Sequence, residues 1–282
     1  MCGADRNSLR GQCGADSKVR IARVGLHNWE EPCISYGKGS GTVFFSGCSL
    51  HCVFCQNHEI SPELKGRDID PSELSDIFLK VRDMGAVNLN LVNPTHYSAD
   101  IARALCSVKH KLGIPVIYNT GGYDRCETLK MFTGLVDIYL PDLKYKNSEF
   151  SLKYSGAGDY FDVAAKAIAE MIHQVGYPEF TVEGHMKSGV LIRHLVLPGQ
   201  SYDSMEILKY LSETYDTEKL YVSIMRQYFP TYKACEIPEL SRRLTTLEYQ
   251  RVIKYAEKVG ITNGFTQEKT SAREEYVPKF DF

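Results

Sequence analysis

The sequence lacks a long hydrophobic run, because no apolar stretch approaches the roughly 18 residues that a membrane-spanning helix requires. Its first residues, MCGADRNSLRGQCGAD, contain no apolar segment of the kind found in secretory signals. A strong charge imbalance is also lacking, since the formal net charge is -2, and this excludes a bulk positive field for nucleic acid. We therefore expect a cytoplasmic protein with neither a membrane nor a nucleic acid as partner.

Low-complexity tracts, long linkers and sequence repeats of about 20 to 50 residues are absent as well. A content of 43% hydrophobic and 24% charged residues is typical of a globular chain and excludes a disordered protein. Against this ordinary background the chain has nine cysteines, an odd number that cannot pair completely. Because the cytosol keeps thiols reduced, some of these cysteines should bind a metal or take part in chemistry.

From about residue 40, short apolar runs alternate with longer amphipathic stretches, a pattern typical of strands followed by helices. Strands are expected near 42–48, 87–93, 115–120, 136–144, 190–199 and 220–228. Helices are expected near 71–84, 99–112, 126–133, 160–175, 204–214 and 245–260. Strands joined through helices pair in parallel, and six units are too few for a closed eight-unit barrel. The sequence thus predicts an α/β fold, an incomplete (β/α)6 TIM-like barrel of parallel strands with outer helices.

The two ends of the chain differ from this regular part. Residues 1–37 show little periodicity and contain three cysteines and the only tryptophan. We expect them to form an irregular, cysteine-containing N-terminal extension. The barrel is expected over 38–264, and residues 265–282 are expected to form a C-terminal tail.

The carboxyl ends of parallel strands meet at one edge of the sheet, where such folds place their chemistry. The residues expected at this edge are Cys48, Cys52, Cys55, Asn93, Thr95, His96, Asn119, Thr120, Gly121, Gly122, Asp142, Lys144, Arg193, Arg226, Gln227 and Tyr228. This gathering of polar and glycine residues is typical of an enzyme site rather than of a scaffold.

The segment GCSLHCVFCQNH is the sharpest signal, because it puts Cys48, Cys52 and Cys55 on one loop. A four-iron cluster usually takes four thiolates, so three would leave one iron open to an outside ligand. Three alternatives compete with this interpretation. The cysteines could form a structural zinc site with His58 as fourth ligand, a redox dithiol at Cys52 and Cys55, or an ordinary buried group.

GCSLHCVFCQN resembles the signature of the radical S-adenosylmethionine (radical SAM) family. In that family three cysteines with this spacing hold a [4Fe–4S] cluster, and S-adenosylmethionine chelates the fourth iron. More narrowly, the chain resembles the pyruvate formate-lyase activating enzyme-like branch, especially its PflX-type members. The segments that carry this resemblance are EEPCISYGKGSGTVFFSGCSLHCVFCQNHEIS, LVNPTHY, YNTGGYD, DLKY, IRHLVLPG and SIMRQYFP. The resemblance covers nearly the whole chain, so 38–264 would be a radical SAM barrel.

The resemblance also implies ligands for S-adenosylmethionine at the first strand ends. Asn93, Thr95 and His96 stand where the branch has a glycine-rich, acidic turn that receives the amino group. This turn lacks the glycine pair and the glutamate, and a capped proline turn is the structural alternative. Asn119 stands at the ribose-contacting turn, where an amide can still bind hydroxyl groups.

Further ligands are implied at the later strand ends. Asp142 and Lys144 lie two residues apart on one face, beside the methionine portion and the sulfonium by resemblance, and an ordinary ion pair is the alternative. Arg193 would lie near the methionine carboxylate, and an arginine paired with a neighbouring acid of the protein is the alternative. Gln227 would lie on the adenine or ribose side. Lys144 and the three cluster cysteines are the residues expected to be catalytic.

The implied activity is that of an oxidoreductase working without oxygen. The reduced cluster would cleave S-adenosylmethionine, and the resulting 5′-deoxyadenosyl radical would take a hydrogen atom from the substrate. The electron donor is expected to be flavodoxin or ferredoxin. The expected substrate is a glycyl-radical enzyme, so that the chain is an activase-like protein. A small molecule or a different protein is the alternative substrate, and a non-catalytic Cys3His zinc-binding module is the alternative class.

The other cysteines carry weaker signals. Cys2 and Cys13 resemble the tail of a cysteine-rich segment in relatives, but the preceding cysteine pair is missing here. The sequence does not decide whether these two and Cys33 bind a second metal or cluster. Cys106, Cys126 and Cys235 are scattered, which is typical of ordinary core or surface thiols.

Overall fold

The computed structural model of the protein describes residues 10–267 and residue 280. One sheet organises the fold, with the strand order β10-β9-β8-β6-β5-β4-β2-β1-β3. The strands are β1 (Val19–His27), β2 (Ser40–Phe45), β3 (Arg67–Ile69), β4 (Leu89–Val92), β5 (Val116–Thr120), β6 (Ile138–Pro141), β7 (Glu179–Phe180), β8 (Met186–Leu195), β9 (Tyr221–Met225) and β10 (Gly264–Thr266). The α-helices are α1 (Pro32–Ser35), α2 (Glu73–Asp83), α3 (Ser98–Leu112), α4 (Cys126–Lys130), α5 (Ser148–Ser155), α6 (Tyr160–Val175), α7 (Ser201–Thr214) and α8 (Thr246–Lys258).

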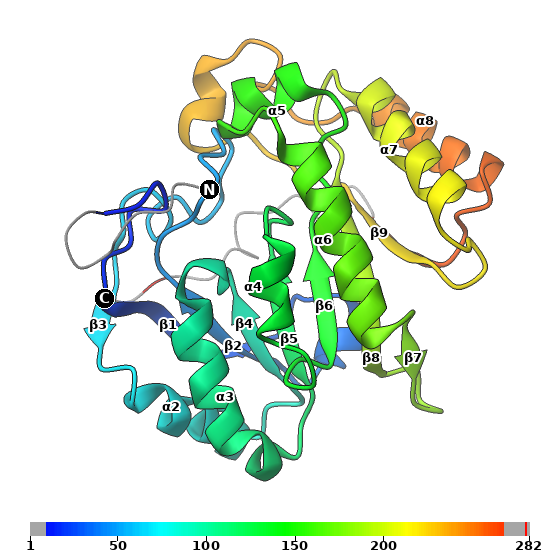
Figure 1. The fold of residues 1–282 in the computed structure, drawn as a ribbon. Helices are drawn as coiled ribbons and strands as arrows, with labels where there is room; N and C mark the ends of the chain where they lie inside the picture. Colours follow the sequence, from blue (N-terminus) through cyan, green and yellow to red (C-terminus); the bar gives the residue numbers. More distant parts are fainter. Residues whose placement is uncertain (1–9, 268–279, 281–282) are drawn as a thin grey trace.

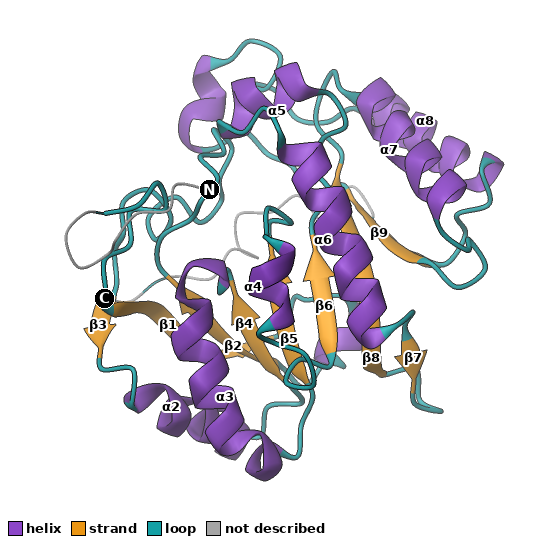
Figure 2. Cartoon of the chain, viewed as in Figure 1, coloured by secondary structure: helices purple, strands orange, loops and turns teal. Residues whose placement is uncertain are grey.

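The central strands β2, β4, β5, β6, β8 and β9 pair in parallel, and β10 extends the row in parallel beside β9. Helices connect each of these strands to the next, and they lie on one side of the sheet (Figure 1). Figure 2 shows the same layering of helices over strands. The predicted α/β fold with six strand–helix units in an open, incomplete barrel is therefore confirmed.

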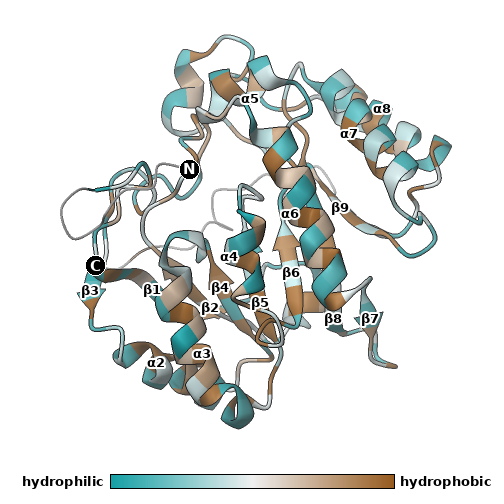
Figure 3. Cartoon of the chain, in the orientation of Figure 1, coloured by the Kyte–Doolittle hydropathy of each residue, from teal (hydrophilic) through white to brown (hydrophobic). Residues whose placement is uncertain are grey.

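The main hydrophobic core lies between the sheet and its covering helices. Leu89 and Leu91 of β4 are fully buried in this core together with Phe78 of α2 and Leu105 of α3. Figure 3 shows apolar strands and helices that are apolar on one side only, as the alternating sequence pattern predicts. Within the described part of the chain, none of the helices is both long and apolar enough to cross a membrane.

The opposite, inner face of the sheet has its own small apolar core. Ile34 of the short helix α1 is completely buried there, in a cluster with Ile117, Ile138 and Leu140 of the central strands. An open barrel leaves these side chains without partners from a closing strand. Helix α1 supplies the missing apolar surface, which is why so short a helix is fully integrated into the fold.

The N-terminal region is therefore not the irregular extension that its sequence suggested. Residues 19–27 form β1, which pairs antiparallel with β2 and with β3. The alternation of Val19 and Ile21 with Arg20 is a strand signal, and both apolar side chains are buried. Residues 264–266 form β10, so the expected tail begins as a strand, and residues 268–279 lie outside the described part.

The sequence pattern does not predict the helix that lies between Lys144 and Tyr160. Helix α5 begins after Asn147, whose side chain caps it by accepting hydrogen bonds from the backbone N–H groups of Glu149 (2.7 Å) and Phe150 (3.3 Å). Gly156 ends the helix in the left-handed conformation, with φ of 71°. The capping residue Asn147 and the terminating Gly156 are visible in the sequence, but the helix is too short and too weakly amphipathic for its pattern to predict it.

Replacement of Ile34 by alanine tests whether α1 belongs to the core. Because the side chain is completely buried, Ile34→Ala should lower the free energy of unfolding by about 2–5 kcal/mol. Val182→Ala, at a fully exposed position, is the matched control and should change it little. Urea unfolding followed by circular dichroism measures both. An Ile34→Ala protein as stable as the control would contradict the integration of α1.

Candidate functional site

The loop with the three cysteines follows β2 and is tied to distant backbone. Cys48 N–H donates to the carbonyl oxygen of Cys13 (3.2 Å). His51 N–H donates to the carbonyl of Ser155 (3.0 Å), and Val53 N–H to that of Tyr154 (2.8 Å). The end of α5 thus holds the middle of the cysteine loop in place.

The three thiols are partly shielded from solvent by this packing. Burial raises the pKa of Cys48 to about 12 and that of Cys55 to about 11, and it also raises the pKa of Cys52. Cys52 Sγ accepts a hydrogen bond from Ser155 Oγ (3.0 Å). Thiols of this kind lose their protons when they bind a metal centre, so loading of the loop with metal should release protons.

Beside the loop, a cavity of about 660 Å³ opens at the carboxyl edge of the sheet. Cys52 and Cys55 line it. Other residues that line it are Asn119, Asp142, Lys144, Arg193, Gln227, Gln56, Asn57 and Gln267. A third group comes from the segment before α1 and consists of His27, Asn28, Trp29 and Glu30. The cavity thus brings soft sulfur ligands together with polar and charged groups.

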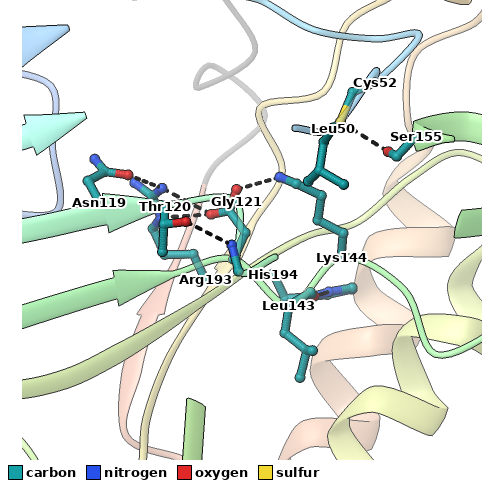
Figure 4. A network of polar contacts seen from close by, with 12 residues as sticks. Leu50, Cys52, Asn119, Thr120, Gly121, Leu143, Lys144, Ser155, Arg193 and His194 are labelled. Carbon is teal, nitrogen blue, oxygen red and sulfur yellow. Dashed lines mark hydrogen bonds and ion pairs between the residues drawn. The ribbon is translucent and has the colours of Figure 1, made fainter. Parts of the chain in front are cut away.

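The charged wall of the cavity is a hydrogen-bonded network around Asp142. Arg193 donates from Nε to Asp142 Oδ1 (3.0 Å) and from Nη2 to Asn119 Oδ1 (2.6 Å). Lys144 forms an ion pair with the other carboxylate oxygen of Asp142. Figure 4 shows Asn119, Lys144, Arg193 and Cys52 grouped at this edge of the sheet. The donors hold the carboxylate in one orientation.

The electrostatics of the network follow from its burial. Burial alone would raise the pKa of Asp142, but Lys144 and Arg193 outweigh it and hold that pKa below its usual value. Burial alone would lower the pKa of Arg193, but Asp142 and two glutamates raise it. Asp142, Lys144 and Arg193 are therefore all charged at neutral pH, and each is only 14% exposed.

At this edge of the sheet the turn after β5 packs closely against the backbone at the end of β6. The carbonyl oxygen of Asp142 lies only 2.1 Å from where a Cβ would stand on Gly122, whose φ is 83°. Any larger residue would push the turn after β5 away from Asp142. The hydroxyl of Tyr160 lies 2.8 Å from the carbonyl oxygens of both Gly121 and Asp142 and accepts from Lys144 N–H (3.0 Å).

A buried histidine holds the chain between Asp142 and Lys144. His194 Nδ1 lies 2.7 Å from the carbonyl oxygen of Leu143, and its Nε2 lies 2.8 Å from Ser204 Oγ. Burial lowers the pKa of His194 to about 4, so the ring is neutral at pH 7. Leu143 N–H in turn donates to the carbonyl of Arg193 (2.8 Å). His194 is therefore a positioning residue for both ends of the ion pair.

Comparisons with known proteins assign this geometry to a family. The sequence model described as the Radical SAM superfamily matches residues 42–211. The chain belongs to the radical SAM superfamily. A protein of Methanocaldococcus jannaschii that is described only as uncharacterized is 32% identical over 270 residues, covering 92% of this chain and 73% of its own. Radical SAM enzymes use a [4Fe–4S] cluster and S-adenosylmethionine and need an electron donor, so the expected cofactors are confirmed.

Solved structures support the same fold. SuiB of Streptococcus suis, solved with its precursor peptide SuiA, superposes with a TM-score of 0.52 at 16% identity. This match covers 78% of the present chain but 46% of SuiB. A variant of spore photoproduct lyase also superposes with a TM-score of 0.52, at 11% identity, over 79% of this chain and 74% of the lyase. At these identities the likeness concerns the fold alone.

The structure gathers most of the sequence-predicted site residues of this radical SAM protein around the cavity. The ones that line it are Cys52, Cys55, Asn119, Asp142, Lys144, Arg193 and Gln227. Cys48 lies on the same loop, and its Sγ accepts a hydrogen bond from Leu50 N–H (3.4 Å). Gln227 Oε1 accepts from Gln267 Nε2 (3.1 Å), a contact between two lining residues.

Three other predicted ligands do not line the cavity. Asn93 donates from Nδ2 to the carbonyl of Gly47, and His96 Nε2 lies 2.7 Å from the carbonyl of Ser46. Thr95 donates from Oγ1 to Asp124 Oδ1 (2.7 Å). Asn93 and His96 thus hold the start of the cysteine loop, and Thr95 contributes to a buried cap on Asp124.

His58, the fourth ligand of the alternative zinc site, points elsewhere. Its Nδ1 lies 3.0 Å from Glu63 Oε1, and its ring stacks on Tyr232 with a centroid distance of 5.0 Å. Within residues 10–267, no three or more His, Cys, Asp or Glu side chains are arranged to hold a single metal ion. The three loop cysteines do not form such a group either, so only the contacts of His58 with Glu63 and Tyr232 speak against a Cys3His zinc module.

Sequence reasoning missed two contributors to the site. Glu30 lines the cavity, although it lies in the segment taken for an irregular extension. Glu30 and Glu31 stand directly before Pro32, and no local pattern distinguishes this pair from a solvent-exposed one. Ser155 reaches Cys52 only through the fold of α5, and no local pattern announces it.

The neutral state of His194 predicts a pH dependence of stability. An unfolded histidine has its ordinary pKa near 6.5, whereas the pKa in the folded protein is about 4. Below pH 6.5 the histidine is therefore protonated in the unfolded chain but stays neutral in the folded chain until the pH approaches 4. The free energy of unfolding consequently falls as the pH is lowered, by about 3 kcal/mol in total from this group.

Urea unfolding between pH 7 and pH 4.5 measures this effect. His194→Gln should have a shallower loss of stability over that range than the wild type. It should retain part of the loss, because burial also lowers the pKa of His27 to about 4. The exposed His110→Gln serves as the control and should keep the wild-type slope. Equal slopes in all three proteins would contradict a neutral, buried His194.

Proposed function

We propose that this radical SAM enzyme holds its [4Fe–4S] cluster through Cys48, Cys52 and Cys55 and binds S-adenosylmethionine in the adjoining cavity. The observation that carries the proposal is that Cys52 and Cys55 line the same cavity as Asn119, Asp142, Lys144 and Arg193. The three thiols fit the cluster, because they are soft ligands on one loop whose set leaves an iron open. The charged wall fits a zwitterionic ligand.

A reduced [4Fe–4S] cluster held by these cysteines would supply the one electron needed for reductive cleavage of S-adenosylmethionine to methionine and a 5′-deoxyadenosyl radical. The residues of the chain bind and orient around this chemistry. Arg193 offers a guanidinium group to the ligand carboxylate, while Asp142 keeps that group in position. Lys144 places a positive charge between Asp142 and the cysteine loop, and it offsets part of the effect of burial, which raises the pKa of Cys52. Asn119 presents an amide to the ribose.

For the substrate, we propose a glycyl-radical enzyme, so that the chain acts as an activase of the pyruvate formate-lyase activating type. The motif resemblance along nearly the whole chain supports this choice. Within residues 10–267 the remaining cysteines, Cys13, Cys33, Cys106, Cys126 and Cys235, are free thiols that are scattered along the sequence and form no second closely spaced motif. Flavodoxin or ferredoxin would supply the electron.

The cofactor assignment predicts a clear difference between cysteine variants. After anaerobic reconstitution with iron and sulfide, the wild type should be brown and should form 5′-deoxyadenosine with dithionite and S-adenosylmethionine. Cys52→Ala should lose both the visible absorbance and at least roughly 100-fold of the product formation, because the cluster loses one of three thiolates. Cys235→Ala, at an exposed cysteine, is the matched control and should keep both.

The substrate assignment is tested by electron paramagnetic resonance. The reconstituted enzyme, S-adenosylmethionine and a reductant are mixed with a glycyl-radical enzyme encoded in the same genome. A glycyl radical signal is expected, and it should be absent when the radical-bearing glycine of that partner is replaced by alanine. Formation of 5′-deoxyadenosine without any glycyl radical would contradict the activase role and favour a small-molecule or other protein substrate.

A further inference from the structure

A buried serine hydroxyl from helix α5 lies against the middle cysteine of the loop. Ser155 Oγ donates a hydrogen bond to Cys52 Sγ (3.0 Å), and Ser155 is only 1% exposed (Figure 4). The backbone of the same residue also holds the loop, since the carbonyl oxygen of Ser155 accepts from His51 N–H (3.0 Å). The hydroxyl is therefore presented to the sulfur from a support that is itself bonded to the loop.

A buried tyrosine next to this serine decides the direction of the hydrogen bonds. The hydroxyl of Tyr145 lies 2.8 Å from Ser155 Oγ, and Tyr145 is 1% exposed. A cysteine that binds a metal is a thiolate without a proton, so its sulfur can only accept hydrogen bonds. Because Ser155 has a single hydroxyl proton and donates it to Cys52, the proton between the two hydroxyls comes from Tyr145. Two consecutive hydrogen bonds thus point toward the sulfur.

The outer two cysteines take their hydrogen bonds from residues that are close in sequence. Cys48 Sγ accepts from Leu50 N–H (3.4 Å). Cys55 is hydrogen-bonded by the backbone of Asn57 and the side chain of Ser61. The middle cysteine differs, because its hydroxyl donor lies 103 residues further along the chain. Its hydrogen bond is thus a contribution of the tertiary structure and not of the loop.

A donor to the sulfur has its largest effect on the reduced form of a cluster. Reduction adds a negative charge to a buried group that already contains three thiolates, and hydrogen bonds to the sulfurs stabilise that charge and raise the reduction potential. Lys144 also favours the thiolate of Cys52, but it is paired with Asp142 and lines the cavity. Ser155 and Tyr145 do not line the cavity, so they can act on the sulfur without touching a ligand there.

We propose that Ser155, supported by Tyr145, raises the reduction potential of the cluster through its hydrogen bond to Cys52. This inference rests on the proposed function, which assigns the cluster to the three loop cysteines. Ser155 acts through a cluster ligand, so it affects how easily the cluster is reduced and makes no contact with S-adenosylmethionine. Helix α5 thus both holds the cysteine loop in place and eases the arrival of the electron in a buried site.

The reduction potential is measured by a redox titration of the reconstituted enzyme, followed by electron paramagnetic resonance without S-adenosylmethionine, so that no turnover occurs. At the midpoint potential of the wild type, Ser155→Ala should lower the ratio of reduced to oxidised cluster about tenfold, which is a shift of about 59 mV for a one-electron couple. Tyr145→Phe should shift the potential in the same direction but less, because Ser155 keeps its bond to the sulfur and loses only its own donor.

Ser151→Ala is the matched control. Ser151 lies in the same helix and is also 1% exposed, but its hydroxyl donates to the carbonyl oxygen of Ser148 (3.0 Å). This variant should have the reduction potential of the wild type. The iron content and the visible absorbance of each protein show that the cluster is loaded before the titration.

An unchanged potential in Ser155→Ala would overturn the inference. An equal shift in Ser151→Ala would also overturn it, because the effect would then come from altered packing of α5. If Ser155→Ala takes up no cluster, Tyr145→Phe provides the test, and an unchanged potential in that variant would overturn the inference. A wild-type protein that takes up no cluster would instead contradict the proposed function, so the two failures are distinguishable.

Discussion

The buried guanidinium group of Arg193 is the interaction on which the functional edge depends. It joins the end of β6 through Asp142, the end of β5 through Asn119 and the segment before α1 through Glu30. An arginine placed inside an apolar strand is tolerated only because these acceptors surround it. Removal of one partner from such a buried pair typically costs about 3–5 kcal/mol. The geometry of the cavity and the stability of three neighbouring segments are therefore parts of the same electrostatic arrangement.

The segment before β2 has two roles that follow from the openness of the barrel. Its apolar part, with Ile34, covers the inner face of the central strands, whose side chains a closed barrel would bury by itself. Its polar part, with Glu30, lies next to that core and borders the cavity. Because the same short stretch completes the core and brings a carboxylate to the ligand cavity, folding of the N-terminal region and assembly of the site are coupled.

The cysteine loop has a comparable dependence on remote structure. Its spacing permits three thiolates to meet one cluster, but its position comes from backbone contacts with Cys13, Tyr154 and Ser155. The side chains of Asn93 and His96, which follow the neighbouring strand β4, bind the backbone carbonyl groups of the residues that begin the cysteine loop. A radical enzyme needs such fixed supports, because its substrate must lie close to a reactive intermediate that water and stray reductants are not allowed to reach.

Local patterns alone were sufficient to predict the strand–helix alternation, the open parallel barrel and the cysteine motif. Each of these depends on spacing within a short stretch, such as the alternation of Leu89 and Leu91 or the helix periodicity over α6. The same patterns misassigned the N-terminal region, because β1 and α1 are stabilised by partners far away in the sequence. The location of Glu30 beside Arg193, the turning of Thr95 away from the cavity and the contact of Ser155 with Cys52 were decided by tertiary structure. Such pairings depend on which distant segments share a buried, low-dielectric environment, and no local spacing encodes that.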